Sequence, residues 1–160
     1  MSRIYPPAYG HYWQDQGAWY VDTVYGFENL KKELADDRSQ YYFIIHHQDH
    51  TPAEQVVGVF KIIQEYPYPP KPTYKAFKVH RIYLDPVTQG KGIGKELMKY
   101  AYQLAQKTQH ELLWLDAMDT HTQAQAFYAS QGFEKTEVQL LDFELLHPKH
   151  RPMWYMHRFL

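Results

Sequence analysis

The sequence predicts a single α/β domain over residues 1–160, built on a mixed β-sheet. From Ala76 onward, strand-like and helix-like segments follow one another as β-α-β-α-β-β, and the first β-α-β unit requires a right-handed crossover between parallel strands. Two segments rich in aromatic and β-branched residues precede this unit and suit an antiparallel pair. A chain with 44% hydrophobic and 22% charged residues over this length can fold around one core.

Each expected element is predicted by its own residue pattern. Apolar residues at spacings of three and four indicate helices, and runs dense in aromatic and β-branched residues indicate strands. The prolines of 66–72 exclude a helix or a central strand there. The expected helices are 19–24, 27–34, 94–107 and 122–130. The expected strands are 40–47, 56–65, 76–84, 112–117, 133–143 and 153–159.

Composition excludes several classes of function. The formal net charge is −1, which gives no general attraction to nucleic acid or to an anionic membrane. The chain has no cysteine, no apolar run of the ~20 residues that cross a bilayer and no apolar signal core, so we expect a cytoplasmic protein without disulfides. We expect no metal site either, because His46, His47 and His50 cannot easily face one ion from a strand, and His147, His150 and His157 are similarly scattered.

A glycine-rich turn separates strand 76–84 from the helix that follows it. Gly90, Gly92 and Gly94 alternate with other residues where that helix begins. Glycines let the backbone bend sharply and approach a ligand, and the free amides of a helix start attract anions. The turn therefore indicates a pyrophosphate site, against the alternative of a turn without a ligand. A dinucleotide fold would place the glycines at the first strand, and a P-loop would have Ser or Thr after Lys95.

The run Gln89-Gly90-Lys91-Gly92-Ile93-Gly94 resembles the Q/R-x-x-G-x-G/A signature of the GNAT superfamily of N-acetyltransferases. The strand end Ile82-Tyr83-Leu84-Asp85-Pro86 is similar to the lead-in of that family. Its A-x-x-F/L-Y-x-x-x-G-F element is matched by Ala124, Phe127-Tyr128 and Gly132-Phe133. The order and spacing of these motifs together carry the resemblance.

The resemblance covers about residues 27–160 and implies a GNAT-like fold. Such a fold has a mixed sheet with two splayed parallel central strands, here ending at Leu84 and near Ala117, and flanking helices. Residues 1–26 are rich in proline and aromatic residues, so the N-terminal strand of the family is expected to be missing or remade. That would leave a sheet edge for a second copy of the chain to cover, as a homodimer.

In the family, acetyl-CoA lies between the splayed strands, and the resemblance assigns its contacts. The pyrophosphate would sit on the backbone amides of 89–94, and the pantetheine arm would run along the strand end 82–84. His121 stands where many members have an asparagine that contacts the pantetheine. Lys91 and Lys95 would add phosphate contacts, or else form a solvated face. The cofactor-binding residues expected are Ile82, Tyr83, Leu84, Gln89, Gly90, Lys91, Gly92, Ile93, Gly94, Lys95 and His121.

The resemblance also implies two catalytic residues. Tyr128 matches the family tyrosine that points at the thioester sulfur, where a donor stabilises the departing thiolate; its alternative is a core tyrosine. The acceptor amine must be neutral to attack, and amines are mostly protonated at pH 7. Lys78 occupies the position of the glutamate that many relatives use as the base. His80 is expected on the same strand face and becomes the candidate base, against the alternative of an exposed strand histidine.

The function expected is an acetyl-CoA-dependent N-acetyltransferase that moves an acetyl group directly to a primary amine of a small molecule or a peptide. Residues 27–43 look most like the bacterial polyamine acetyltransferase branch, which makes a polyamine one candidate. Lys78 and the unusual segment 1–26 keep open a non-catalytic acyl-CoA-binding or interaction module. Asp116 is either a cation-attracting group or ordinary surface, and we expect the aromatic residues of 1–26 to form a packing surface rather than a binding cage.

Overall fold

The computed structural model describes residues 1–47, 54–88 and 90–160. One mixed sheet has the strand order β1-β2-β3-β4-β6-β5, in which only the β3–β4 pair is parallel. The strands are β1 (Ser39–His47), β2 (Glu54–Ile63), β3 (Ala76–Leu84), β4 (Leu112–Met118), β5 (Glu134–Leu140) and β6 (Pro152–Phe159). The helices are α1 (Tyr5–Tyr9), α2 (Ala18–Val24), α3 (Phe27–Leu34), α4 (Ile93–Lys107) and α5 (Thr122–Ser130). The expected α/β architecture is therefore confirmed.

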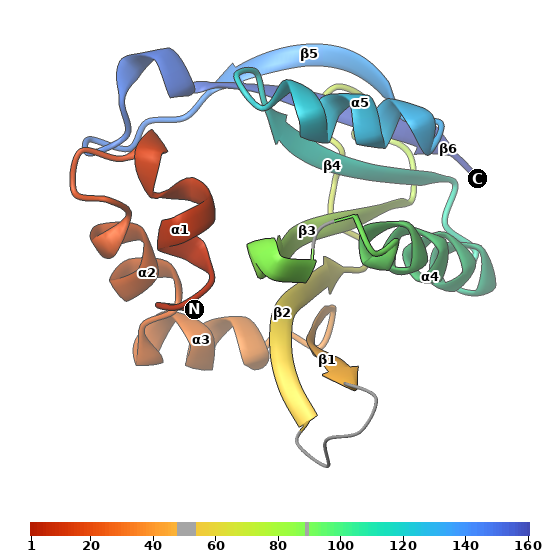
Figure 1. Cartoon of the computed structure of the whole chain (residues 1–160). Helices are drawn as coiled ribbons and strands as arrows, with labels where there is room; N and C mark the ends of the chain where they lie inside the picture. The colour runs from red at the N-terminus through yellow and green to blue at the C-terminus, as the bar shows by residue number, and fades with distance from the viewer. Residues whose placement is uncertain (48–53, 89) are drawn as a thin grey trace.

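The two parallel central strands, β3 and β4, part from each other after a short paired stretch. They pair only from Ala76 with Leu112 to Lys78 with Trp114. Just beyond, Lys61 of β2 faces Arg81 and Ile62 faces Val79, so His80 is the extra residue of a β-bulge. A bulge bends its strand, which agrees with the divergence that begins here. The expected splay between the central strands is thus present, and Figure 1 shows the opening.

The main core lies between the sheet and the helices α4 and α5. Met98, Ala101 and Ala105 form the buried stripe of α4 and pack against strand residues such as Phe77 and Leu115. These three α4 residues recur at spacings of three and four, as in the pattern that predicted the helix. This packing fixes the start of α4 beside the carboxyl end of β3.

Residues 1–38 form no strand and fold instead into α1, a 3₁₀ helix at Gly10–Tyr12, α2 and α3. Tyr5, Tyr12 and Trp13 pack with Leu146 in a second buried cluster, and Trp13 forms an isolated bridge with Leu146. The expectation that the first strand is missing or remade is confirmed. Figure 1 shows α1 and α2 beside the opening between β3 and β4.

The expected helix 27–34 is present as α3, whereas one expected strand has different bounds. The apolar spacing of α3 does not mark a buried face, because Phe27 is 76% and Leu34 62% exposed. The residue that ties α3 to the sheet is Glu33, whose carboxylate pairs with Lys61. The strand expected at 133–143 is shorter, because the segment after Leu140 turns toward the N-terminal cluster instead of continuing the β5–β6 ladder.

At the outer edge of the sheet, β1 pairs only with β2 among the described strands. A second copy of the chain over this edge stays a prediction. None of the helices in the described ranges is long and apolar enough to cross a bilayer.

Candidate active site

Two adjoining hollows lie at the opening between β3 and β4. The outer groove, of about 350 Å³, is lined by the end of β3, the turn glycines Gly90 and Gly92, the first residues of α4 at 93–95 and one face of α5. The inner cavity, of about 140 Å³, lies between β3 residues 79–83, β4 residues 115–118 and tyrosines of the N-terminal segment. The residues that line both hollows are Tyr9, Ile82, His121, Ala124 and Tyr128. We call this shared set the junction.

The turn before α4 gives the outer groove a cradle for an anion. Gly90 and Gly92 have φ angles of 76° and 77°, and an added Cβ at either would meet no atom within 4 Å. Gly92 is the N-cap of α4 and provides no side-chain cap. Within the described ranges the amides of Ile93 and Gly94 have no acceptor. Free amides at the positive end of a 15-residue helix suit a phosphate group.

Gly94 has a different role from the two glycines before it. A Cβ there would lie 3.3 Å from Cζ of Phe127, so the missing side chain allows α5 to approach the start of α4. That approach brings Phe127 and Tyr128 to the outer groove. The three glycines therefore serve two needs, a left-handed turn and a close contact between helices.

Most of the residues predicted to bind the cofactor line the outer groove. These are Ile82, Leu84, Gly90, Gly92, Ile93, Gly94, Lys95 and His121. Tyr83 does not; its side chain belongs to the inner cavity, where it packs against Tyr5 and Tyr9. Lys91 is exposed and lines neither hollow. Gln89 lies outside the described residues.

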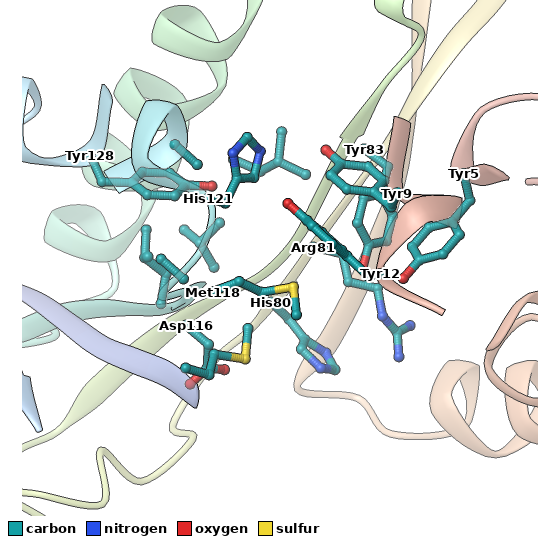
Figure 2. A pocket seen from close by; sticks show the side chains of 16 residues that line it. Tyr5, Tyr9, Tyr12, His80, Arg81, Tyr83, Asp116, Met118, His121 and Tyr128 are labelled. Carbon is teal, nitrogen blue, oxygen red and sulfur yellow. The ribbon is translucent and has the colours of Figure 1, made fainter. Parts of the chain in front are cut away.

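At the junction, three side chains can handle protons. Figure 2 shows Tyr128 and His121 on the side of the cavity opposite Tyr9 and Tyr83. Burial raises the pKa of Tyr128 and raises that of Tyr9 to about 12, so both hydroxyls keep their protons at neutral pH. Burial, together with His11, lowers the pKa of His121, which is therefore neutral at pH 7. The junction thus offers two proton donors and one proton acceptor.

His80 lines the inner cavity, and the bulge provides the strand bend that a base at this position would need. Its Nδ1 is buried without a hydrogen-bond partner among the described residues. Burial and the nearby Arg81, Lys78 and Lys61 lower the pKa of His80 to about 2. The prediction of His80 as a base assumed the ordinary pKa of an imidazole, and the lowered pKa contradicts that assumption. A base this weak is poorly matched to neutral pH. Its catalytic role stays a prediction.

Five charged side chains lie at or behind the inner cavity and are paired. Lys78 Nζ lies 2.6 Å from Asp116 Oδ2 and bridges the two strands where they begin to part. Arg81 makes a bidentate pair with Glu33 at 2.8 and 3.0 Å, and Lys61 Nζ lies 2.9 Å from the same carboxylate. Asp116 is thus an ion-paired group at the cavity, and Lys78 is engaged with it.

The histidines do not form a metal centre in the parts of the chain that the structure describes. Over these residues no three His, Asp or Glu side chains come close enough to hold an ion. His150 instead shares a hydrogen bond with Thr120, and His157 with Thr136. His50 lies outside the described residues.

Comparison with known proteins assigns the chain to a family. Residues 1–133 match the sequence model of the "Acetyltransferase (GNAT) family". The chain belongs to this family. The match begins at residue 1, earlier than the sequence resemblance at 27. A relative in Lactobacillus delbrueckii subsp. lactis, described as an uncharacterized N-acetyltransferase in the pepI 3' region, is 25% identical over 118 residues; the match covers 74% of this chain and 65% of the relative.

Solved structures of GNAT acetyltransferases share the fold. The IAA acetyltransferase from Bacillus cereus superposes with a TM-score of 0.63 at 19% identity, covering 84% of this chain and 85% of that one. The spermidine N-acetyltransferase from Vibrio cholerae, solved with CoA and spermine, gives a TM-score of 0.61 at 16% identity, with 84% and 73% covered. These likenesses support the GNAT fold.

The inner cavity of this GNAT protein includes residues that sequence reasoning missed. Tyr5, Tyr9 and Tyr12 were expected to pack, and they do, but they also line the cavity. Tyr5 and Tyr9 are four residues apart on α1, a spacing that places them on one helical face, and Tyr12 follows in the 3₁₀ helix. The cavity they face is formed by β3 and β4, so the local sequence alone could not reveal it.

Proposed function

We propose that the chain is an acetyl-CoA-dependent N-acetyltransferase that moves the acetyl group directly to a primary amine. The observation that carries this proposal is the junction, where a groove with a candidate phosphate cradle meets the inner cavity beside Tyr128 and His121. A donor thioester and an acceptor amine bound in the two hollows would meet there. Family membership supports the same reaction. Cytoplasmic location and homodimerisation stay predictions.

The outer groove is proposed to bind acetyl-CoA. The amides of Ile93 and Gly94, with the dipole of α4, would hold the pyrophosphate, and Lys95 adds a positive charge at the rim. Beyond the splay, β3 pairs with no strand of the described residues on its β4 side. Its backbone at Ile82 and Leu84 is therefore available to the pantetheine arm, as an added strand would pair.

The proton acceptor that we propose is His121 rather than His80. When the amine nitrogen bonds to the acetyl carbon, the bond from that carbon to sulfur breaks and the nitrogen must lose a proton. His121 is neutral at pH 7 and lies at the junction, so it can take this proton directly or through one water. Tyr128, which stays protonated, donates to the departing thiolate sulfur.

The substitution Tyr128→Phe tests the proposal. It removes the donor hydroxyl and keeps the ring, so we expect kcat to fall by about 10- to 100-fold while CoA affinity stays within twofold. Thiol release with a panel of amines measures kcat, and calorimetry measures CoA binding. Tyr100→Phe, on the exposed side of α4, is the matched control and should behave as the unchanged protein. CoA binding with no turnover of any amine would instead favour the non-catalytic module.

A further inference from the structure

The inner cavity has a wall of aromatic rings. Four tyrosines form this wall: Tyr5, Tyr9, Tyr12 and Tyr83. The ring of Tyr83 lies 5.3 Å from each of the Tyr5 and Tyr9 rings, centroid to centroid. A second layer engages two of the hydroxyls, because Trp13 Nε1 donates to Tyr5 at 2.9 Å and Tyr20 shares a hydrogen bond with Tyr83 at 2.8 Å. Ring faces and edges therefore make up much of this side of the cavity (Figure 2).

The rest of the cavity is small and combines apolar side chains with the polar groups of His80, Arg81, Asp116 and His121. Met118 and Met153 contribute thioethers, and Leu115 and Ala117 contribute aliphatic surface. The thioether of methionine packs well against aromatic rings. The volume of about 140 Å³ matches that of an engineered apolar cavity that holds one benzene molecule. The inner cavity thus has room for a single ring with a short chain.

Among the described residues that line the cavity, no carboxylate is left unpaired for a cationic ligand. Asp116 Oδ2 pairs with Lys78, and its Oδ1 accepts a hydrogen bond from Gln139 at 2.9 Å. Behind β3, Glu33 is shared between Lys61 and Arg81 and also accepts from Tyr41. Three buried cations thus face two carboxylates, among the described residues that line or back the cavity. A ligand with several positive charges would enter a site that already has one positive charge in excess.

We propose that the acceptor is a primary amine carried on one aromatic ring, with no second cationic group, and that the cavity selects against polyamines. This inference rests on the proposed function. The ring stacks on the tyrosine wall in offset or edge contacts, and the amine reaches the junction beside His121. A single amine loses its charge before attack, so it avoids the excess positive charge that a polyamine would meet.

Rates with a series of amines test the selection. Thiol release from acetyl-CoA is followed with 2-phenylethylamine, n-hexylamine, spermidine and a short peptide with a free N-terminus. We expect kcat/KM for 2-phenylethylamine to exceed that for spermidine at least tenfold and to exceed that for n-hexylamine. Equal or faster acetylation of spermidine, or faster acetylation of the peptide, overturns the inference and leaves the proposed function standing.

Two variants test the wall and the charges separately. Tyr12→Leu should lower kcat/KM for 2-phenylethylamine more than for n-hexylamine, whereas Tyr100→Leu, on the outside of α4, changes neither. Lys78→Met removes the cation that pairs with the carboxylate of Asp116. The ratio of kcat/KM for 2-phenylethylamine to kcat/KM for spermidine should then fall at least threefold. Thermal melting establishes whether each variant is folded. If a variant is unfolded, the rates of the amine series with the unchanged protein decide whether the cavity selects against polyamines.

The absence of any turnover would still leave the inference testable. Calorimetry of the chain with CoA then measures binding of 2-phenylethylamine and of spermidine. Binding of the aromatic amine alone supports the acceptor class and refutes only the catalytic proposal. Binding of spermidine, or of neither amine, overturns the acceptor class.

Discussion

Replacing His121 by asparagine separates two roles that this residue can have. Asparagine can still donate a hydrogen bond to the pantetheine arm, as it would in many GNAT members, but it cannot accept a proton near neutral pH. The acceptor amine has a pKa of ~10, so only about one molecule in 10³ is neutral at pH 7. Loss of a base that accepts its proton therefore lowers the rate. We expect kcat/KM to fall by about 10²-fold or more while CoA affinity is kept.

The low pKa of His80 makes this residue the control for His121. A pKa of about 2 makes His80 a far weaker base than an ordinary imidazole. It is neutral at every pH of the assay and cannot produce a limb in the pH–rate profile. His80→Asn should therefore keep the limb of the unchanged protein, whatever it does to KM.

The assay is kcat/KM against pH, from thiol release with saturating acetyl-CoA. Below the pKa of the amine, kcat/KM rises tenfold per pH unit because more of the amine is neutral. A base acts in its neutral form and burial lowers the pKa of His121, so log kcat/KM should rise with a slope of two up to a pH below 6.5, and with a slope of one from there to the pKa of the amine. The steeper rise below 6.5 should be reduced to a slope of one in His121→Asn. Its persistence there, or its disappearance in His80→Asn, would refute the reasoning.

Two further predictions concern the groove and the buried charges. Gly92→Val places a β-branched residue at a φ of 77° with free space around its Cβ, so the strain of ~1–2 kcal/mol should leave the chain folded. The CoA affinity measured by calorimetry should fall at least tenfold. Lys107→Ala, exposed in the last turn of α4, should keep the affinity of the unchanged protein, and an unchanged affinity in Gly92→Val would contradict the anion cradle. Glu33→Gln leaves Lys61 and Arg81 buried without their carboxylate and should lower the free energy of unfolding in urea by about 3 kcal/mol or more. Asp36→Asn, at an exposed pair with Arg38, is the control and should leave that free energy unchanged. A Glu33→Gln variant as stable as the unchanged protein would show that the ion cluster does not hold α3 to the sheet.

The elements with strong local patterns were predictable from the sequence. The expected ranges for β3, α3 and α5 agree with the structure, and that for α4 differs by one residue at its start. The buried face of α3 could not be predicted from its apolar spacing, because periodicity identifies a helix but not its partner. Glu33 faces inward because Lys61 and Arg81, distant in sequence, need a counter-charge there.

The part of the site that depends on backbone conformation could be predicted from the sequence. The part that depends on side chains brought together from distant positions could not. The glycines of 90–94 could be recognised locally because a left-handed turn before a helix restricts residue type. The basicity of His80 could not be judged, since its pKa is set by burial and by cations from two strands. Asp116 likewise has no local signal that it pairs with Lys78 across β3 and β4.

The tyrosine wall makes the two halves of the site separately changeable. Tyr5, Tyr9 and Tyr12 come from one contiguous stretch of eight residues, while the glycine cradle and Tyr128 belong to the α4 and α5 region. Tyr9 also lines the outer groove, whereas Tyr5 and Tyr12 line the inner cavity alone, so substitutions at these two positions can reshape what the inner cavity accepts without altering the lining of the groove. In a lineage of such proteins, acceptor preference could diverge through Tyr5 and Tyr12 while the donor half drifts little. The same separation makes these two positions the place to randomise when new acceptors are sought by selection.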